Sequence, residues 1–300
     1  SRQNVGVGSK LVQSKKENEL LKLTKAEDLV NFGFESEFIG RLPVRCILDT
    51  LTQEDLYSIL KMPNNPVILS KRLDFNAYDI KIIFTDEALK IIAKRAYEEN
   101  TGARGLVSAI EEALLDFEEK LPSHDLLKFT VTKKILEDPK GCLIDFLAKK
   151  NALKWENIYE KALLNYKDYI SKYINDNKKI FSIRHGLTLS QIRCDMTALY
   201  FCNNVMEIED ALNKIKKVHD SIKEIEIEVL KNYNLNIIFE EDAIDFLIEQ
   251  FINHNATNQE ILSKIYDNYY NGFNLIREKT GKNRFFLSKN ALIDNETYLN

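Results

Sequence analysis

Two arginines, Arg41 and Arg104, lie beside glycines in short segments and are the residues of this sequence best suited to chemistry. A guanidinium group is planar, always charged and shaped to bind phosphate or carboxylate oxygens. Without the surrounding motif, Arg41 is better explained as a surface arginine paired with a carboxylate such as Glu37. Arg104 is equally explained as an arginine that caps a helix. The choice depends on the sequence around them.

The histidines and cysteines do not have the spacing of a metal site. The cysteines are widely spread and form no CxxC pair, and the histidines show no ligand spacing. We therefore expect no metal ion and no disulfide framework. The residues concerned are Cys46, Cys142, Cys194, Cys202, His124, His185, His219 and His254.

Composition excludes several classes of protein. The 300 residues carry a formal net charge of -4, and nucleic-acid binders need a basic face, so we expect no nucleic-acid partner. No apolar run is long enough to span a bilayer, and the first residues do not form a signal peptide. These features predict a soluble, cytoplasmic protein without a membrane partner. The low content of Gly and Pro favours a mostly helical chain.

Residues 79–138 show a clear order of elements. Residues 79–84 read as a strand, and Thr85 with Asp86 can cap a helix of regular apolar spacing. Thr101–Gly102 breaks that helix, and a second helix follows. Residues 129–132 then read as another strand, followed by a short closing helix or turn.

The last 65 residues repeat this order at an offset of about 155 residues. Ile82–Leu89 has its counterpart in Ile237–Ile244. Val131–Lys134 corresponds to Leu287–Asn290 with one residue more. A chance match is the alternative, but agreement in order over about 55 residues favours a duplication that has since diverged.

Two motifs resemble those of ClpX-type AAA+ unfoldases at the family's spacing. Ser36–Pro43 is similar to the segment PEFIGRLP, with Ser in place of the first Pro. Asn100–Leu106 is similar to KTGARGL. The resemblance covers residues 5 to about 137 and includes further matches at Val5–Gly8, Glu27–Gly33, Ala113–Asp116 and Leu121–Ser123.

The resemblance implies roles for four residues. Arg41 would be the arginine finger, which acts in trans on the ATP of a neighbouring subunit and stabilises charge developing on the γ-phosphate. Arg104 would be the sensor-2 residue, bound to the ATP of its own subunit. Gly102 permits the turn before its helix, and Ala103 would join it at the nucleotide.

ATP, as Mg-ATP, is thus the cofactor implied for the full-length protein. The sequence lacks a GxxxxGK[ST] loop, so this chain alone should neither bind nucleotide nor hydrolyse it. In the second copy Gln259 stands where the first has Arg104, and a neutral amide offers phosphate no fixed charge. We expect the second copy to be structural or to make protein contacts.

The expected fold is mainly α: an AAA+ C-terminal small (lid) domain with short β-strands, a helical connector and a degenerate second small-domain-like repeat. Residues 1–65 would end the large AAA+ domain, with a buried strand at 42–48. Residues 66–140 would form the small domain, 141–234 the connector and 235–300 the repeat.

The function implied by the resemblance is that of a hexameric AAA+ ring, a chaperone and ATP hydrolase. It would unfold tagged or unfolded proteins and feed a ClpP-type peptidase for proteolysis. The alternative is a non-catalytic ClpX-like scaffold or adaptor that makes protein contacts through its helical extension. A third interpretation is a helical interaction protein whose AAA+ features are coincidental. Nucleotide-binding motifs upstream of this sequence would favour the unfoldase.

Overall fold

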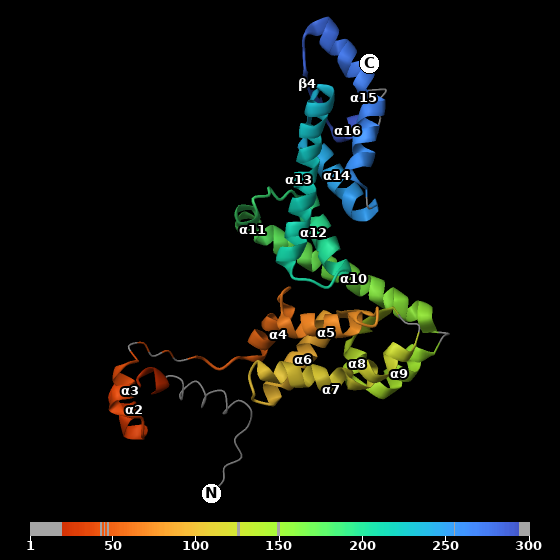
Figure 1. The fold of residues 1–300 in the computed structure, drawn as a ribbon. Coiled ribbons are helices and arrows are strands. Elements are labelled where there is room, and N and C mark those ends of the chain that lie inside the picture. The colour runs from red at the N-terminus through yellow and green to blue at the C-terminus, as the bar shows by residue number, and fades with distance from the viewer. Residues whose placement is uncertain are drawn as a thin grey trace. The chain divides into compact units, whose positions relative to one another are not determined.

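The computed structural model describes residues 20–42, 44, 46, 48–124, 127–148, 151–254 and 256–293. The chain divides into two units by its internal contacts. One consists of Ser1–Leu60 and Leu89–Glu112, and the other of Lys61–Ala88 and Ala113–Asn300. The domain boundaries expected from the sequence remain predictions. The described elements are mainly helical, as expected (Figure 1).

In the described residues before α5 lie the helices α2 (Ala26–Phe32), α3 (Ser36–Gly40) and α4 (Gln53–Lys61). Thr52 caps α4, because its Oγ1 accepts a hydrogen bond from the Asp55 amide at 3.2 Å. The Asp55 carboxylate in turn accepts from the Thr52 amide at 2.8 Å. These bonds from Thr52 lower the pKa of Asp55 below its usual value.

The buried strand predicted at 42–48 is wrong for the residues that the structure describes there. Leu42, Val44, Cys46 and Leu48 are exposed and belong to no strand. A strand needs a neighbour to satisfy its backbone amides and carbonyls. The structure places no other strand in the described part of 20–65, so the apolar residues of this segment have no sheet to join.

The first copy begins with a helix that the sequence pattern did not reveal and continues in the predicted order. Its elements are α5 (Pro66–Asn76), β1 (Lys81–Phe84), α6 (Asp86–Glu98), α7 (Arg104–Lys120), the 3-10 turn η1 (Leu121–Ser123), β2 (Lys128–Val131) and α8 (Lys133–Glu137). The strands pair in parallel, with Ile82 beside Phe129 and Phe84 beside Val131. Thr85 caps α6 as expected, accepting from the Ala88 amide at 3.3 Å.

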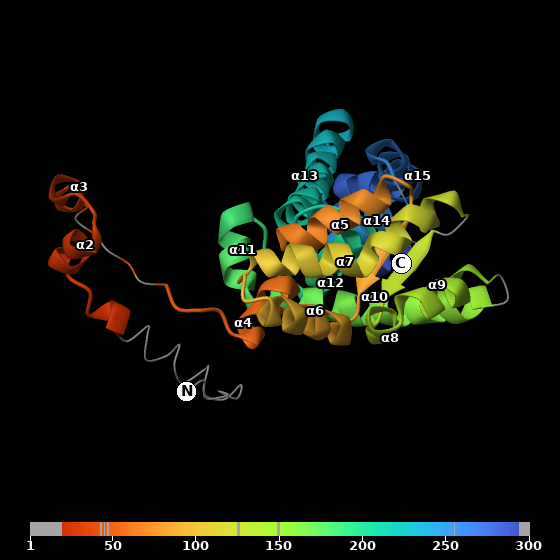
Figure 2. The same cartoon turned by 90° about the horizontal axis from the view of Figure 1, so that it is seen from below.

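The elements described in the connector are all helices, as predicted. It comprises α9 (Pro139–Leu147), α10 (Ala152–Asp176), α11 (Lys178–His185), α12 (Gln191–Asn203) and α13 (Ile208–Tyr233). The first half of α10 lies over β1 and β2 (Figure 2). Further along, α10 packs on α12, where its Tyr166 ring lies 6.2 Å from that of Phe201.

The second copy repeats the element order of the first. β3 (Asn236–Phe239), α14 (Glu241–His254), α15 (Asn258–Thr280), β4 (Arg284–Leu287) and α16 (Lys289–Ile293) follow α13, as β1 to α8 follow α5. Its strands are also parallel, with Phe239 beside Leu287. The internal repeat is therefore present in the fold.

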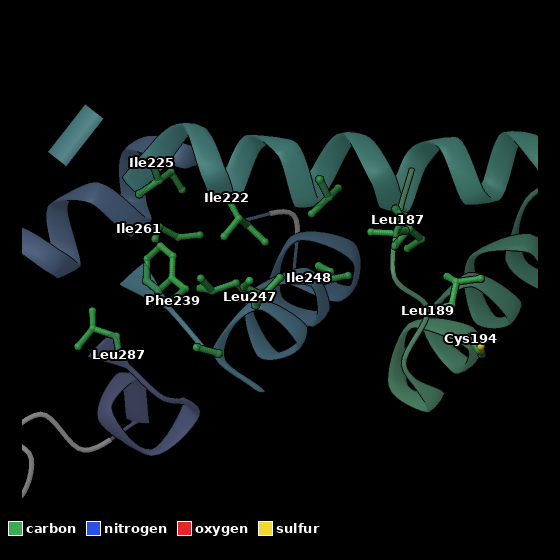
Figure 3. Packing of buried hydrophobic residues seen from close by; sticks show 14 of the residues in the cluster. Leu187, Leu189, Cys194, Ile222, Ile225, Phe239, Leu247, Ile248, Ile261 and Leu287 are labelled. Atoms are coloured by element: carbon green, nitrogen blue, oxygen red, sulfur yellow. The ribbon is translucent and has the colours of Figure 1, made fainter. Parts of the chain in front are cut away.

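One continuous hydrophobic core joins the connector to the second copy. Figure 3 shows Ile222 and Ile225 of α13 directed toward Phe239 of β3 and Leu247 of α14. Leu187, Leu189 and Cys194 extend the same cluster to α12 and the segment before it. Figure 1 shows α13 running beside α14 and α15. Burial of these apolar side chains fixes the position of β3 and β4.

Candidate functional site

Arg104 is the first residue of α7, directly after a turn with left-handed backbone. Asn100 and Gly102 have φ of 56° and 66° in this turn, and glycine adopts such values without strain. Arg104 and Ala103 are exposed, and the first turn of α7 contains no acidic residue. Within the described part of the chain, the Arg104 guanidinium has no ion-pair partner. An exposed cation thus stands at a helix end that favours anions.

Gly105 lets this turn approach the end of α6 closely. A Cβ on Gly105 would lie 2.6 Å from Thr101 Oγ1 and 3.0 Å from the carbonyl oxygen of Ala96. The first distance is too short for a carbon atom, and the second is tighter than most Cβ contacts. The absence of a side chain at Gly105 therefore holds the start of α7, and Arg104 with it, in place.

Arg41 lies on a different element and caps the C-terminal end of α3. Its backbone amide donates to the carbonyls of Glu37 and Phe38, at 3.3 and 3.1 Å. Its side chain is exposed and, among the residues that the structure describes, makes no ion pair; the pairing with Glu37 considered above does not form. Ile39 is the buried residue of this helix, at 6% exposure. The helix presents Arg41 to solvent.

The equivalent turn of the second copy is built differently. The Thr257 Oγ1 accepts from the Glu260 amide at 3.3 Å, and the Glu260 carboxylate accepts from the Thr257 amide at 2.9 Å. This capping box satisfies two amides of α15 and places a negative charge at its start. Gln259 is exposed beside it. This helix end repels anions, whereas the start of α7 attracts them.

Two polar residues that sequence reasoning missed tie α5 and the loop before it to the connector. Arg72 is buried, and its Nη2 donates to the carbonyls of Phe201, Cys202 and Asn204 at the end of α12. The side-chain Oδ1 of Asn64 accepts from the Ile208 amide at 2.8 Å, at the start of α13. Both satisfy helix-terminal groups that the helices cannot satisfy themselves. A single arginine in a segment to which the sequence analysis assigned no element gives no signal of this kind.

The described residues contain neither a cluster suited to a metal ion nor a helix that could span a membrane. No group of three or more His, Cys, Asp or Glu among them could hold a metal ion. No helix in the described ranges is both long and apolar enough to cross a membrane.

The first copy is similar to parts of known Clp proteins. A family profile described as the C-terminal, D2-small domain of ClpB protein matches residues 51–132. The ATP-dependent Clp protease ATP-binding subunit ClpX of Borrelia duttonii (strain Ly) is 40% identical over 114 residues. These residues are 38% of this chain and 27% of the relative. The ClpX of Borrelia recurrentis (strain A1) matches to the same extent.

The chain carries a ClpX-like C-terminal AAA+ portion. The matched family region contains the whole of α6 and α7 and therefore Gly102, Ala103 and Arg104. The chain spans about a quarter of the length of the ClpX relatives, at 27%. Within the ClpX-like portion the structure keeps the exposed arginine at the start of α7. The connector and the second copy extend well beyond the family match.

Proposed function

We propose that this chain is the C-terminal part of an ATP-dependent protein unfoldase, the ATP-binding subunit of a Clp-type protease. The whole protein would work as a hexameric ring in the cytoplasm and pass unfolded proteins to a ClpP-type peptidase. The similarity to ClpX and to the ClpB small domain supports this proposal. The observation that carries it is the exposed Arg104 at a non-acidic helix start after a left-handed turn.

Arg104 is proposed to bind the phosphates of ATP held in its own subunit, and Gly102 and Ala103 form the turn that positions it. Arg41 is proposed to reach the ATP of the neighbouring subunit. Bound Mg-ATP supplies the phosphoryl group and the charge that both arginines meet. A guanidinium offers parallel N–H donors to phosphate oxygens and stays charged throughout turnover. The residues that hold the rest of the nucleotide are not in this sequence.

A non-catalytic scaffold or adaptor is the second candidate for the extension. The capping box of Thr257 and Glu260 closes the helix end that would otherwise meet phosphate, and Gln259 adds no charge. These features favour protein contacts over nucleotide contacts for the second copy. Both functions can coexist in one ring, with the first copy sensing ATP and the second binding a partner.

The experiment uses rings assembled from two variants of the complete protein, Arg41→Ala and Arg104→Ala. Each variant alone should lose most of its ATPase activity. In mixed rings, an Arg41→Ala subunit keeps its own Arg104 and receives Arg41 from an Arg104→Ala neighbour. That pairing restores an intact site, so mixed rings should be more active than either parent. Turnover at saturating ATP is the measurement.

Two outcomes would contradict the assignment. Mixed rings with no recovery would mean that both arginines act on the same subunit's nucleotide. Full activity of the single variants would mean that neither touches ATP. Arg41→Lys is the matched control, because it keeps the charge but loses the planar pair of donors and should remain impaired.

A further inference from the structure

The two copies differ in what lies over one face of their strand pairs. Side chains alternate between the two faces of a strand. In β1 and β2, three consecutive residues of each strand are buried, so both faces are covered. In β3 and β4, only every second residue is buried. One face of the second pair is therefore more open to solvent than its counterpart in the first.

The first copy shows what kind of element covers this face. Ile83 packs in a small buried cluster with Tyr159 and Ala162 of α10, and Leu163 borders it. At the edge, Lys128 Nζ lies 2.6 Å from Glu160 and 3.1 Å from Glu156. Glu160 and Glu156 both raise the pKa of Lys128 above its usual value. The cover is thus an amphipathic helix with two carboxylates one turn apart.

The second copy retains the same pattern of partners on its own face. At the repeat offset, Ile238 corresponds to Ile83, Arg284 to Lys128 and Phe286 to Thr130. Arg284 is exposed, and its guanidinium lies 5.2 Å from the centre of the Phe286 ring. Phe286 is 46% exposed. The apolar centre and the cation at the edge are kept, and the aromatic ring enlarges the apolar part.

The segment that leads into β4 is mostly basic. Lys279 and Lys282 are exposed and precede Arg284 in the segment that enters β4, and Glu278 is the acidic residue among 278–284. An arginine can also bind a carboxylate through two parallel hydrogen bonds, which a lysine cannot do. The second copy is therefore better equipped than the first to attract an acidic helix.

We propose that the outer face of β3 and β4, formed by Asn236, Ile238, Arg284 and Phe286, is a docking surface for an amphipathic helix of a partner protein. That helix would place apolar side chains on Ile238 and Phe286. Two carboxylates one turn apart would meet Arg284, as Glu156 and Glu160 meet Lys128. The inference rests on the internal repeat and does not depend on any role in ATP hydrolysis.

The test uses the first half of α10 as the probe. A fluorescein-labelled peptide of residues 152–167 carries Tyr159, Ala162 and Leu163 with both carboxylates. We expect saturable binding to the full chain by fluorescence anisotropy, weakened by added salt. Arg284→Glu should weaken it about tenfold, which corresponds to about 1.4 kcal/mol. Lys214→Glu, a charge reversal on the first half of α13, is the matched control and should bind normally.

A charge exchange makes the test specific. A peptide in which Glu156 and Glu160 are both replaced by Lys should not bind the wild-type chain. It should bind the Arg284→Glu variant. Phe286→Ser should also weaken binding while the circular dichroism of the chain stays unchanged. Absence of saturable binding, or equal binding to wild type and Arg284→Glu, would overturn the proposal.

Two other occupants would also overturn it. A concentration-dependent dimer in sedimentation velocity that Arg284→Glu abolishes would identify a second copy of this chain as the occupant. Peptide binding seen only in a chain shortened after Ile293 would identify the chain's own last residues. Neither result is expected if a separate partner helix docks on this face.

Discussion

At the scale of single residues, a charged side chain can be buried where the chain offers it a partner. Arg193 is 1% exposed; its Nε lies 2.6 Å from Asp245 and its Nη2 2.6 Å from Glu241. Its Nη1 donates to the carbonyl of Thr188 at 2.8 Å. The two carboxylates differ in environment, because Asp245 is 6% exposed as a residue and the Glu241 side chain 75%. Their contributions to stability should therefore differ.

Asp245→Asn should destabilise the chain by about 2 kcal/mol, because it leaves a buried guanidinium without its buried counter-charge. Glu241→Gln removes a solvent-screened charge and should cost less than about 1 kcal/mol. Urea unfolding followed by circular dichroism measures both. Equal losses for the two variants would mean that the Nε contact with Asp245 is not a strong ion pair.

The thiols offer a second test at the residue scale. Burial raises the pKa of Cys202 to about 12 and raises those of Cys142 and Cys194, so these thiols stay protonated at pH 8. Only a thiolate attacks a disulfide reagent. Of the four cysteines, Cys46 is exposed and the other three are buried. The native chain should react rapidly at Cys46 alone, and unfolding in guanidinium should release the rest. Rapid reaction of Cys202 in the native chain would contradict its burial.

At the scale of elements, the sequence predicted those whose apolar spacing is regular. Thr85 before α6 and the break at Gly102 were read correctly from capping and turn preferences. α5 was missed because its buried face carries Lys71 and Arg72, which hide the helical period. Asn65 followed by Pro66, a cap and a proline at the first helical position, was the available signal.

The predicted strand at 42–48 failed for the opposite reason. Its residue types favour a strand, but a strand forms only beside a neighbour, and no pattern in one segment reports whether that neighbour exists. The motifs pointed to Arg41 and Arg104, which are both exposed, and their roles stay predictions. Arg284 was not found, because its relevance appears only when the covered and open strand pairs are compared.

The start of α7 allows a prediction about an element boundary. Alanine normally improves on glycine inside a helix by up to about 1 kcal/mol. Gly105→Ala should do the reverse and destabilise the chain by about 1–3 kcal/mol, because its Cβ would meet Thr101 and Ala96. Gly40→Ala, where nothing lies within 4 Å, is the control. Thermal unfolding should show a lower midpoint for Gly105→Ala, and a higher one would show that the turn can relax.

At the scale of the whole molecule, the two copies share an architecture and differ in chemistry. In the first copy, the turn before α7 leads to the exposed Arg104. In the second copy, the capping box of Thr257 and Glu260 occupies the equivalent start of α15. In the parallel strand pairs the contrast is reversed, since the first is covered by α10 and the second is more open. The first copy thus exposes a basic helix start, and the second copy exposes one face of its strand pair.

The contrast predicts unequal effects of two matched variants on ATP turnover by the complete protein. Arg104→Ala should lower the ATPase rate at least about tenfold, because a phosphate loses a charged partner. Gln259→Ala, at the equivalent position, should leave the rate near wild type. Steady-state kinetics of both variants at several ATP concentrations checks this. A large loss with Gln259→Ala would mean that the second copy also contacts nucleotide.

The 25 residues of α10 have a mechanical consequence. At a rise of 1.5 Å per residue, such a helix is a stiff rod about 37 Å long. In its first half, Tyr159 packs on Ile83 of β1 and Glu160 pairs with Lys128 of β2. Its later turns pack into the core shared with α12. From Glu160 to its last residue, Asp176, the rod is about 24 Å long, so a rotation of the first copy by about 10° as ATP is bound and released would move the far end by about 4 Å. Each ATP turnover would then displace the part of the chain that follows α10.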